Sequence, residues 1–225
     1  YGNRIINEAH GIHFLSKEEQ SKTMILKNKN SIISRNGVES FSELSNFQER
    51  KNIILFIGRI DTFHKGIDRL ICQIQANASY LSKKNFKIDL YGPSNKNDKK
   101  NIHKLIEKNN LKELISLHDP VSKDERNKLL QNSKYFIHTS RLEGQPQAVL
   151  EAMAHGCIPL ITDECNMSSD IKANKCGFIV NCEEDENIFR AIGESNSQVI
   201  SNNCVLFAKK YLNWKNIGKD FLNDI

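Results

Sequence analysis

This sequence lacks the features that would place it in a membrane or on a secretory route. Its longest apolar runs, such as Ile53–Ile57, are far too short to cross a bilayer. Its first residues do not show a charged segment followed by an apolar one, so we expect no signal peptide. The sequence also does not begin with methionine, and we therefore expect a piece of a longer chain.

Paired cysteines and clustered positive charge are missing as well. The six cysteines form no Cys-x-x-Cys pair and have no histidine at metal-ligand spacing, so the sequence predicts no metal site. Most of them lie in apolar surroundings, which predicts reduced, buried thiols in a cytoplasmic protein. The net charge of +5 comes from scattered lysines, which argues against nucleic-acid binding. A peripheral contact with the inner face of an anionic membrane stays open.

What the sequence does contain is a regular alternation of strand and helix patterns after residue 50. Its 225 residues, 39% hydrophobic and 26% charged, are enough for one good core. Short apolar runs predict six strands that are covered on both faces, at 53–57, 86–91, 115–118, 135–139, 158–161 and 178–180. Helix patterns lie between them, at 67–81, 99–109, 123–131 and 147–155. This alternation predicts an α/β fold with a doubly wound parallel six-stranded Rossmann-like sheet.

The two ends of the chain differ from this alternation. Residues 12–15 and 31–34 are typical of strands, on either side of a helix that the Ser16–Glu19 capping box begins. The polar stretch 39–51 is typical of a linker, and 204–225 of a helix with one apolar face formed by Trp214, Ile217, Phe221 and Leu222. We therefore divide the chain into the end of a preceding domain with a linker (1–48), a Rossmann-like domain (49–205) and a C-terminal helix that packs back (206–225).

The first candidate site follows the first strand of the alternation and reads Gly58-Arg59-Ile-Asp-Thr-Phe-His64-Lys65-Gly66. Its glycines allow a close approach of the backbone to a ligand. The planar fork of Arg59 and the point charge of Lys65 suit a diphosphate. The alternative is a surface loop with two solvated cations.

The second candidate site is Glu143-Gly-Gln-Pro-Gln-Ala-Val-Leu-Glu151, a turn that opens a helix between two predicted strands. Such a turn lies at the carboxyl edge of a parallel sheet, where free N–H groups can bind a phosphate or a sugar. Glu143 can accept hydrogen bonds from sugar hydroxyls or stabilise a cationic transition state. Glu151 can hold the vicinal hydroxyls of a ribose. An ordinary surface role is the alternative for Glu151, although its apolar neighbours predict a half-buried carboxylate that needs partners.

Together these two segments resemble the retaining glycosyltransferases of family 4. The matching pattern is Gly-Arg…Lys-Gly, followed by Glu-Gly-x-Pro-(four residues)-Glu-Ala-Met-Ala-x-Gly-x-x-Pro. Asn36-Gly37-Val38, Tyr91-Gly92-Pro93 and Gly177-Phe178-Ile179-Val180 match further segments, so the resemblance covers nearly all of residues 12–215. It implies a GT-B architecture of two Rossmann-like domains facing a cleft, of which this chain carries the C-terminal, donor-binding domain.

The resemblance also implies a role for each matching residue. Gly58, Arg59 and Lys65 bind the donor diphosphate, Glu151 binds the nucleotide ribose, and Glu143 is the catalytic residue beside the donor sugar. The remaining implied contacts are with the sugar and phosphate at Gly144, Gln145, Pro146 and Gln147, and near the base at Val121 and Gly92. Because no Asp-x-Asp motif is present, we expect no metal and no cofactor besides the donor substrate. Electrostatic stabilisation of the leaving diphosphate is then the main catalytic effect.

The sequence departs from the family pattern at two places. Arg35 stands where the family has proline before Asn36-Gly37, and the loop 163–170 lacks the usual glycine pair and carries Asp170 in place of glutamate. The acceptor-side domain, with its glycine-rich loop and frequent catalytic histidine, is not matched by this chain. Six of the seven histidines are expected to be structural, namely His10, His13, His64, His118, His138 and His155. The alternative for His10 and His13, which are three positions apart, is that catalytic histidine or a metal-binding pair.

The sequence therefore predicts the donor-binding part of a retaining hexosyltransferase. The donor is expected to be a UDP- or GDP-linked sugar, and the acceptor a glycan or a lipid-linked molecule of surface polysaccharide synthesis. We expect the chain alone to be inactive. The alternative is a Rossmann-like nucleotide-sugar-binding module, or a GT-B epimerase-like protein, without transferase activity.

Overall fold

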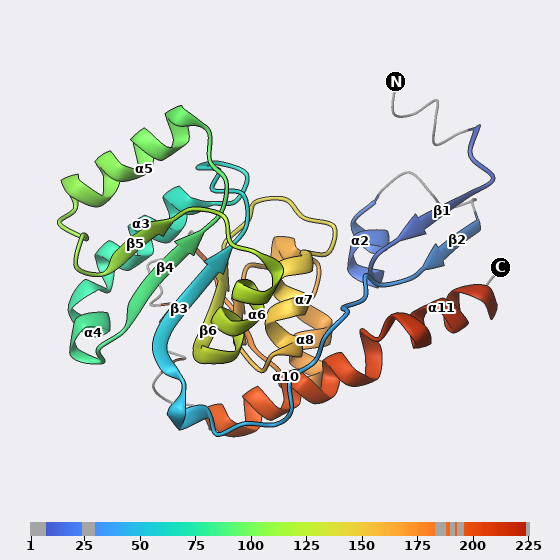
Figure 1. Cartoon of the computed structure of the whole chain (residues 1–225). Coiled ribbons are helices and arrows are strands. Elements are labelled where there is room, and N and C mark those ends of the chain that lie inside the picture. The colour runs from blue at the N-terminus through green and yellow to red at the C-terminus, as the bar shows by residue number, and fades with distance from the viewer. Residues whose placement is uncertain (1–7, 24–29, 183–187, 190–191, 193–195, 224–225) are drawn as a thin grey trace.

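The computed structural model describes residues 8–23, 30–182, 188–189, 192 and 196–223. Its centre is a six-stranded parallel sheet in the order β5-β4-β3-β6-β7-β8 (Figure 1). The strands are β3 (Lys51–Ile57), β4 (Lys87–Tyr91), β5 (Ile115–His118), β6 (Ser133–His138), β7 (Ile158–Ile161) and β8 (Phe178–Ile179). The chain adds strands to one side of β3 and then, from β6 on, to the other side. This order is that of a doubly wound fold and confirms the predicted sheet.

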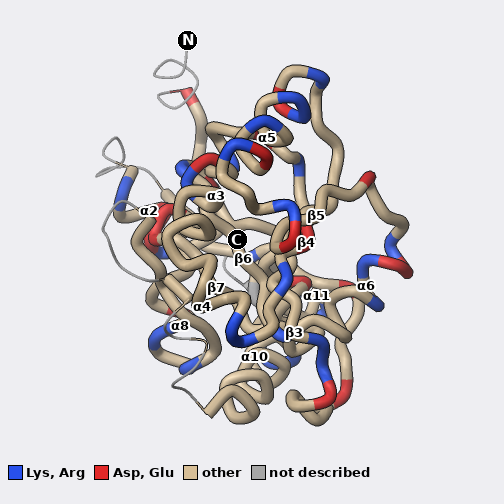
Figure 2. The backbone as a smooth tube through the Cα atoms, turned by 90° about the vertical axis from the view of Figure 1, so that its left-hand side faces the viewer, with Lys and Arg blue, Asp and Glu red and all other residues tan. Residues whose placement is uncertain are grey.

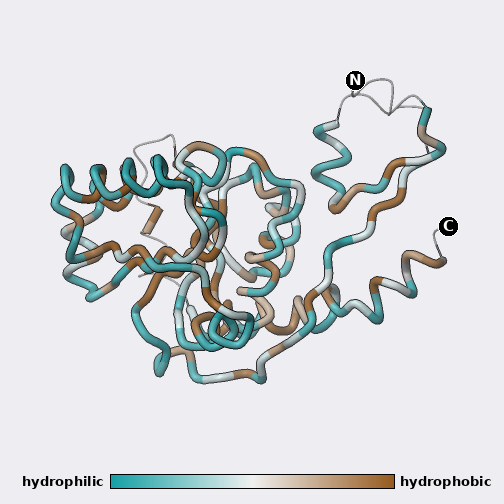
Figure 3. Tube along the Cα trace, turned by 45° about the horizontal axis from the view of Figure 1, so that its top comes forward, coloured by the Kyte–Doolittle hydropathy of each residue, from teal (hydrophilic) through white to brown (hydrophobic). Residues whose placement is uncertain are grey.

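Helices cover both faces of the sheet. They are α3 (Ile67–Ala76), α4 (Ala78–Lys83), α5 (Lys96–Lys108), α6 (Lys123–Asn132), α7 (Gln147–Ala154), α8 (Ser168–Asn174) and α10 (Ser197–Tyr211). In β3, Ile54 and Phe56 belong to one buried cluster with residues of α3, α4 and α5. Leu55 belongs to the other cluster, with residues of α6, α7 and α10. The alternation of side chains along a strand thus divides the core into two layers, and Figure 3 shows the hydrophobic strands between more hydrophilic helices.

The N-terminal and C-terminal segments lie together on one side of the sheet (Figure 1). Strands β1 (Gly11–Phe14) and β2 (Asn30–Ile33) form a separate parallel pair, joined through α2 (Lys17–Lys22). Helix α11 (Trp214–Asn223) lies near this pair, and the rings of His13 and Phe221 are 6.0 Å apart. An isolated bridge between Val38 and Asn213 connects the two segments to each other.

Three predicted elements are corrected by the structure. The helix predicted at 67–81 breaks at Asn77, whose side-chain amide donates to the carbonyl of Gln73 (2.8 Å) and so competes with the helix. Helix α5 begins at Lys96 rather than 99, because the Asn95 side chain caps it by accepting from the Asp98 N–H (2.8 Å). The C-terminal helix pattern divides into α10 and α11, and Asn213 caps α11 by accepting from the Lys215 N–H (2.9 Å).

Two surface expectations are also only partly met. Ile217 of α11 is buried, but Leu222 is 74% exposed and Trp214 is 49% exposed, so the predicted apolar face does not pack along its whole length. The polar stretch 39–51 contains the 3₁₀ turn η1 (Phe47–Glu49), and both Phe47 and Arg50 are buried. This stretch is therefore tied into the core rather than being a simple linker.

The charged residues are spread along the chain (Figure 2), and most of the cysteines are buried, as expected. Figure 2 marks Lys and Arg in blue and Asp and Glu in red along the backbone, and residues of both signs occur in many parts of the chain. All six cysteines are free thiols, and four of them are buried (Cys157, Cys165, Cys176 and Cys204). Among the helices that the structure describes, none has both the length and the apolar character that crossing a membrane requires.

Candidate functional site

The candidate site lies where the two central strands end. β3 and β6 are neighbours in the sheet, and the loops that follow them contain Lys65 and Glu143 respectively. The order of strands reverses at this point, and ligands of open α/β sheets bind in the crevice that the reversal leaves at the carboxyl ends of the strands. The two candidate sites predicted from sequence therefore come together here.

The loop after β3 is held in one shape by Asp61 and Gly66. The Asp61 carboxylate accepts from the N–H groups of Phe63 (3.1 Å) and His64 (2.7 Å), which closes a turn. Gly66 has φ +64, and a Cβ atom there would lie 2.0 Å from the carbonyl oxygen of Thr139. Only glycine allows this loop to lie against the loop after β6.

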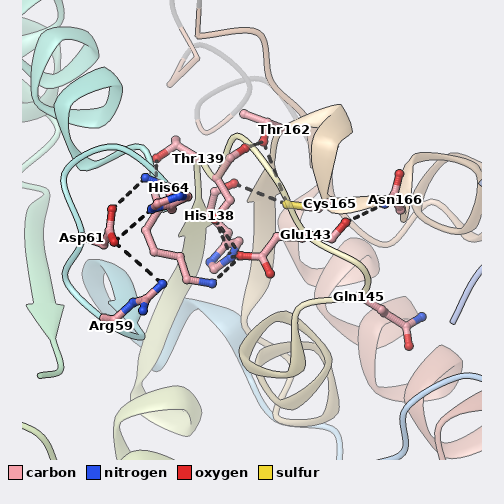
Figure 4. Close-up of polar contacts among 12 residues, drawn as sticks. Arg59, Asp61, His64, His138, Thr139, Glu143, Gln145, Thr162, Cys165 and Asn166 are labelled. Atoms are coloured by element: carbon pink, nitrogen blue, oxygen red, sulfur yellow. Dashed lines mark hydrogen bonds and ion pairs between the residues drawn. The ribbon is translucent and has the colours of Figure 1, made fainter. Parts of the chain in front are cut away.

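The two cations of this loop have different partners (Figure 4). Lys65 Nζ lies 2.5 Å from Glu143 Oε1, and both side chains are mostly buried. Arg59 is 64% exposed and lies 3.7 Å from Asp61 Oδ2. The structure thus brings Lys65 and Glu143 together, and it leaves the Arg59 guanidinium largely in solvent.

The loop after β4 touches the same region through glycine. The Gly58 N–H donates to the carbonyl of Tyr91 (3.0 Å). Gly92 has φ +148, and a Cβ atom there would lie 1.8 Å from the Gly58 carbonyl oxygen. Gly92 is therefore needed for the close approach of these two loops. Val121, the other residue predicted near the base, lines a separate cavity of about 350 Å³ with Tyr91 and Leu129.

Glu143 receives three hydrogen bonds on one oxygen. Besides Lys65, the donors to Oε1 are His138 Nε2 (2.9 Å) and Ser140 Oγ (2.8 Å). Burial alone would raise the pKa of Glu143, but the hydrogen bonds from His138 and Lys65 outweigh it and hold the pKa at about 2. The carboxylate is consequently ionised at every physiological pH. Asn166 holds the backbone of the same residue by donating to its carbonyl (2.7 Å).

The turn that follows Glu143 has free N–H groups and occupied side chains. The N–H groups of Gly144, Gln145 and Gln147 donate to no acceptor in the described part of the chain. The side chain of Gln145 accepts from the Asn36 N–H (2.8 Å), and that of Gln147 donates to the Gly37 carbonyl (2.9 Å). Pro146 precedes the first residue of α7. The backbone of this turn is thus available to a ligand, while its two glutamines fix the segment after β2.

Glu151 opens into a different cavity from Glu143. Its carboxylate lies 3.1 Å from Arg126 Nη2, and burial raises its pKa although Arg126 opposes this. The cavity, about 260 Å³, is lined by both of these residues together with Lys123, Gln147, Trp214 and the segment 38–40. Glu143 instead lines a cavity of about 340 Å³ with Arg141, Leu142 and residues of α2.

Four residues around the site were not singled out for function by sequence reasoning. They are His138 and Ser140 beside Glu143, Arg126 beside Glu151, and Asn166. His138 was expected to be structural, and the structure places it against Glu143. The available signal was its position as the last residue of a buried strand, immediately before the loop of interest. Over the described residues, no three His, Cys, Asp or Glu side chains form a group that could hold a metal ion.

Solved structures with the same fold are numerous. This chain is similar to a mutant of S. aureus TarM that was solved with fondaparinux, α-GlcNAc-glycerol and UDP. The TM-score is 0.78 and the identity 23%, and the match covers 97% of this chain and 44% of that one. The pneumococcal O-GlcNAc transferase GtfA, solved with UDP and GlcNAc, has a TM-score of 0.77 and an identity of 14%. The match covers 100% of this chain and 46% of GtfA. Sucrose-phosphate synthase from Thermosynechococcus elongatus has a TM-score of 0.82 and an identity of 16%. The match covers 99% of this chain and 59% of the synthase.

These likenesses establish the fold, and the chain spans only about half the length of these proteins. No curated protein matches the sequence. The family described as "Glycosyl transferases group 1" matches residues 38–219, which include both loops of the candidate site and the cavity at Glu151. The chain therefore belongs to the glycosyl transferases group 1 family.

Proposed function

We propose that this chain is the donor-binding part of a retaining hexosyltransferase that uses a UDP- or GDP-linked sugar. The observation that carries the proposal is the meeting of Lys65, the ionised Glu143 and the free N–H groups of the turn after it at one sheet edge. These N–H groups belong to Gly144, Gln145 and Gln147. A cation and free N–H groups suit a diphosphate. A carboxylate beside them suits a sugar that becomes cationic in the transition state.

The ligands of similar structures support a nucleotide sugar. TarM and GtfA were solved with UDP, and HepE of Anabaena was solved with UDP-glucose. In our proposal Lys65 and Arg59 stabilise the negative charge on the leaving diphosphate, and Glu143 stabilises the positive charge on the sugar. Glu151 binds the ribose from its own cavity, and Val121 and Gly92 lie near the base. The reaction needs no metal ion.

We further propose that the acceptor is a glycan or a lipid-linked molecule of surface polysaccharide synthesis, bound by an acceptor-side domain. Catalysis then takes place in the cytoplasm, at or near the inner face of the membrane. Six free thiols are consistent with a reducing compartment. In this proposal the chain carries at most the end of the acceptor-side domain, so residues 1–225 alone are expected to bind nucleotide without transferring sugar.

Calorimetric titration of UDP and GDP tests the proposal. Lys65→Ala and Arg59→Ala should each weaken binding of the preferred nucleotide by about tenfold or more, as expected for a lost charge-assisted hydrogen bond of about 1.5–3 kcal/mol. Lys104→Ala, at an exposed position on α5, is the matched control and should bind like the wild type. Equal affinities in all four proteins would refute the diphosphate role.

A second experiment separates a transferase from a binding module. In the full-length protein, Glu143→Ala should reduce turnover far more than it reduces donor affinity, because the carboxylate acts on the sugar rather than on the nucleotide. Equal losses of turnover and affinity would favour a module that only binds nucleotide sugars.

A further inference from the structure

The three donors to Glu143 differ in how firmly they are held. His138 is 2% exposed at the end of β6, and its ring stacks on those of Phe56 and Phe136, with centroid distances of 5.8 Å and 6.3 Å. Ser140 is completely buried, and its carbonyl accepts from the Thr162 hydroxyl (2.8 Å). Lys65 instead reaches Glu143 with a long, flexible side chain from the loop after β3. His138 and Ser140 are therefore fixed in the packed core, whereas the Lys65 side chain can move away from Glu143.

The hydrogen bonds around His138 fix where its proton lies. A carboxylate can only accept, and the Ser140 hydroxyl donates its proton to Glu143 Oε1. His138 Nε2 therefore carries the hydrogen that points at Oε1 (2.9 Å) and at Ser140 Oγ (3.0 Å). The other ring nitrogen, Nδ1, is buried and accepts nothing from the described residues. Burial lowers the pKa of His138 although Glu143 opposes this, so the ring is neutral at physiological pH and Nε2 is the donor.

The second oxygen of Glu143 has a different environment. Each of the three hydrogen bonds goes to Oε1, and Oε2 accepts none from the residues that the structure describes. Oε2 also does not belong to the buried atoms that lack partners. Figure 4 shows it pointing away from the dashed contacts. With Oε1 held, Oε2 is left for a ligand in the cavity that Glu143 lines.

In the proposed function Lys65 has two partners, Glu143 and the donor diphosphate, and it cannot neutralise both at once. In the structure Lys65 neutralises Glu143, yet the donor diphosphate also needs this cation. When Lys65 turns to the diphosphate, a half-buried carboxylate loses its only cationic partner among the described residues. A buried charge without hydrogen bonds is costly, so other donors must keep Glu143 in place.

We propose that His138, together with Ser140, is a positioning residue that holds Glu143 by Oε1, so that Oε2 stays directed at the donor sugar when Lys65 turns to the diphosphate. This inference rests on the proposed function for its last step. The hold on Glu143 itself does not depend on any ligand. The two parts can therefore be tested separately.

Carboxyl NMR of the chain tests whether His138 and Ser140 hold Glu143, and it needs no nucleotide sugar. Glu143 is assigned by comparison with Glu143→Gln and followed as the pH is lowered. In the wild type it should stay ionised to the lowest pH at which the protein is folded. In His138→Leu its pKa should rise by at least one unit, and in Ser140→Ala by a smaller amount. His118→Leu, which removes a histidine beside Asp89 at the end of β5, should leave Glu143 unchanged.

Other charged groups near Glu143 must be accounted for in this titration. Besides Lys65, the cavity is lined by Glu19, Lys22, Arg141 and Glu164. These groups are the same in every variant, so they shift all the curves together. If neither the folded His138→Leu nor the folded Ser140→Ala variant moves the Glu143 titration, the positioning role is wrong.

Kinetics of the full-length protein test the last step. With UDP-glucose or UDP-N-acetylglucosamine as the probe, His138→Leu should lower kcat at least tenfold and change the donor KM by less than about twofold, because the effect is on the sugar. The acid limb of its pH profile should move to higher pH. His138→Gln, which can still donate, should recover most of kcat. Equal losses of kcat in His138→Leu and His138→Gln, or a loss of donor affinity instead of kcat, would overturn the proposal.

The two proposals can fail separately. Failure of the wild type to bind nucleotide would refute the proposed function, while the NMR titration would still show whether His138 and Ser140 hold Glu143.

Discussion

Arg35 and Asp170 form a bidentate ion pair, with Arg35 Nη2 2.7 Å from one carboxylate oxygen and 2.9 Å from the other. Both residues replace a residue of the family that the sequence resembles, Arg35 a proline and Asp170 a glutamate. The pair joins the segment after β2 to helix α8, and both side chains are partly buried. These two replacements thus form one structural feature, a contact between the N-terminal segment and the central domain.

A double-mutant cycle of Arg35→Ala and Asp170→Ala should give a coupling free energy of about 0.5–1 kcal/mol, because the pair is planar and partly shielded from water. The measurement is urea unfolding at low salt, and the coupling should shrink as salt is added. The exposed pair Lys209 and Glu43 is the matched control and should show a smaller coupling. A coupling at Arg35 that does not exceed the control would contradict this reading.

Arg50 should be among the most sensitive positions for stability. Its guanidinium is buried and donates to the carbonyls of Leu130 (3.1 Å), Ser133 (3.2 Å) and His155 (2.7 Å) at the ends of α6 and α7. Arg50→Met removes the donor to all three carbonyls and should lower the free energy of unfolding by about 2–4 kcal/mol. Urea unfolding measures this loss.

Arg50→Lys should recover only part of that loss, because one ammonium group cannot replace the planar fork. The control is Lys104→Met, at an exposed position of α5, which should change stability by no more than about 0.5 kcal/mol. Similar effects at the two positions would show that the buried contacts of Arg50 contribute little.

Gly66→Ala tests the approach of the two loops of the site. With φ +64 and a new Cβ atom 2.0 Å from the Thr139 carbonyl, the variant should lose at least about 2 kcal/mol of stability and displace Lys65 from Glu143. Gly218→Ala, in α11 with nothing within 4 Å of the added Cβ, is the opposite case. It should be neutral or stabilising by up to about 1 kcal/mol. Thermal unfolding of both variants checks this, and a harmless Gly66→Ala would be inconsistent with the described geometry.

His155 should make stability depend on pH in a mildly acidic window. Burial lowers its pKa to about 4 from a usual 6.5, helped by the nearby charges of Arg126 and Arg50. Between these two pKa values His155 is protonated in the unfolded state and neutral in the folded state. The stabilising effect of a neutral His155 is complete above about pH 6.5 and is lost as the pH falls through 4.

The measurement is the difference in unfolding free energy between the wild type and His155→Gln from pH 7.5 to 4.5. This difference should shift against the wild type on acidification. The same substitution at the exposed His103 provides the control for general acid effects. If the difference in unfolding free energy stays constant over this pH range, the pKa of His155 is not lowered in the folded state.

Much of the fold could be predicted because its signals are local. Apolar runs bounded by turns located the six strands of the sheet, and the capping box at Ser122 located the start of α6, where the structure shows both of its hydrogen bonds. The errors arose where an asparagine side chain competed with a helix, at Asn77, or began one, at Asn95 and Asn213. Such competition depends on which rotamer the surroundings allow, and periodicity does not report it.

The sequence by itself determined the alternation of strands and helices, and it identified two loops with residues suited to a diphosphate and a sugar. Only the tertiary structure decided which of those residues meet. Lys65 and Glu143 are 78 positions apart, and they touch because β3 and β6 are neighbours at the point where the strand order reverses. The same packing put Arg126 on Glu151 and His138 on Glu143. Spacing along a chain predicts the faces of single elements, whereas contacts between loops depend on strand order and on side chains brought together from distant segments.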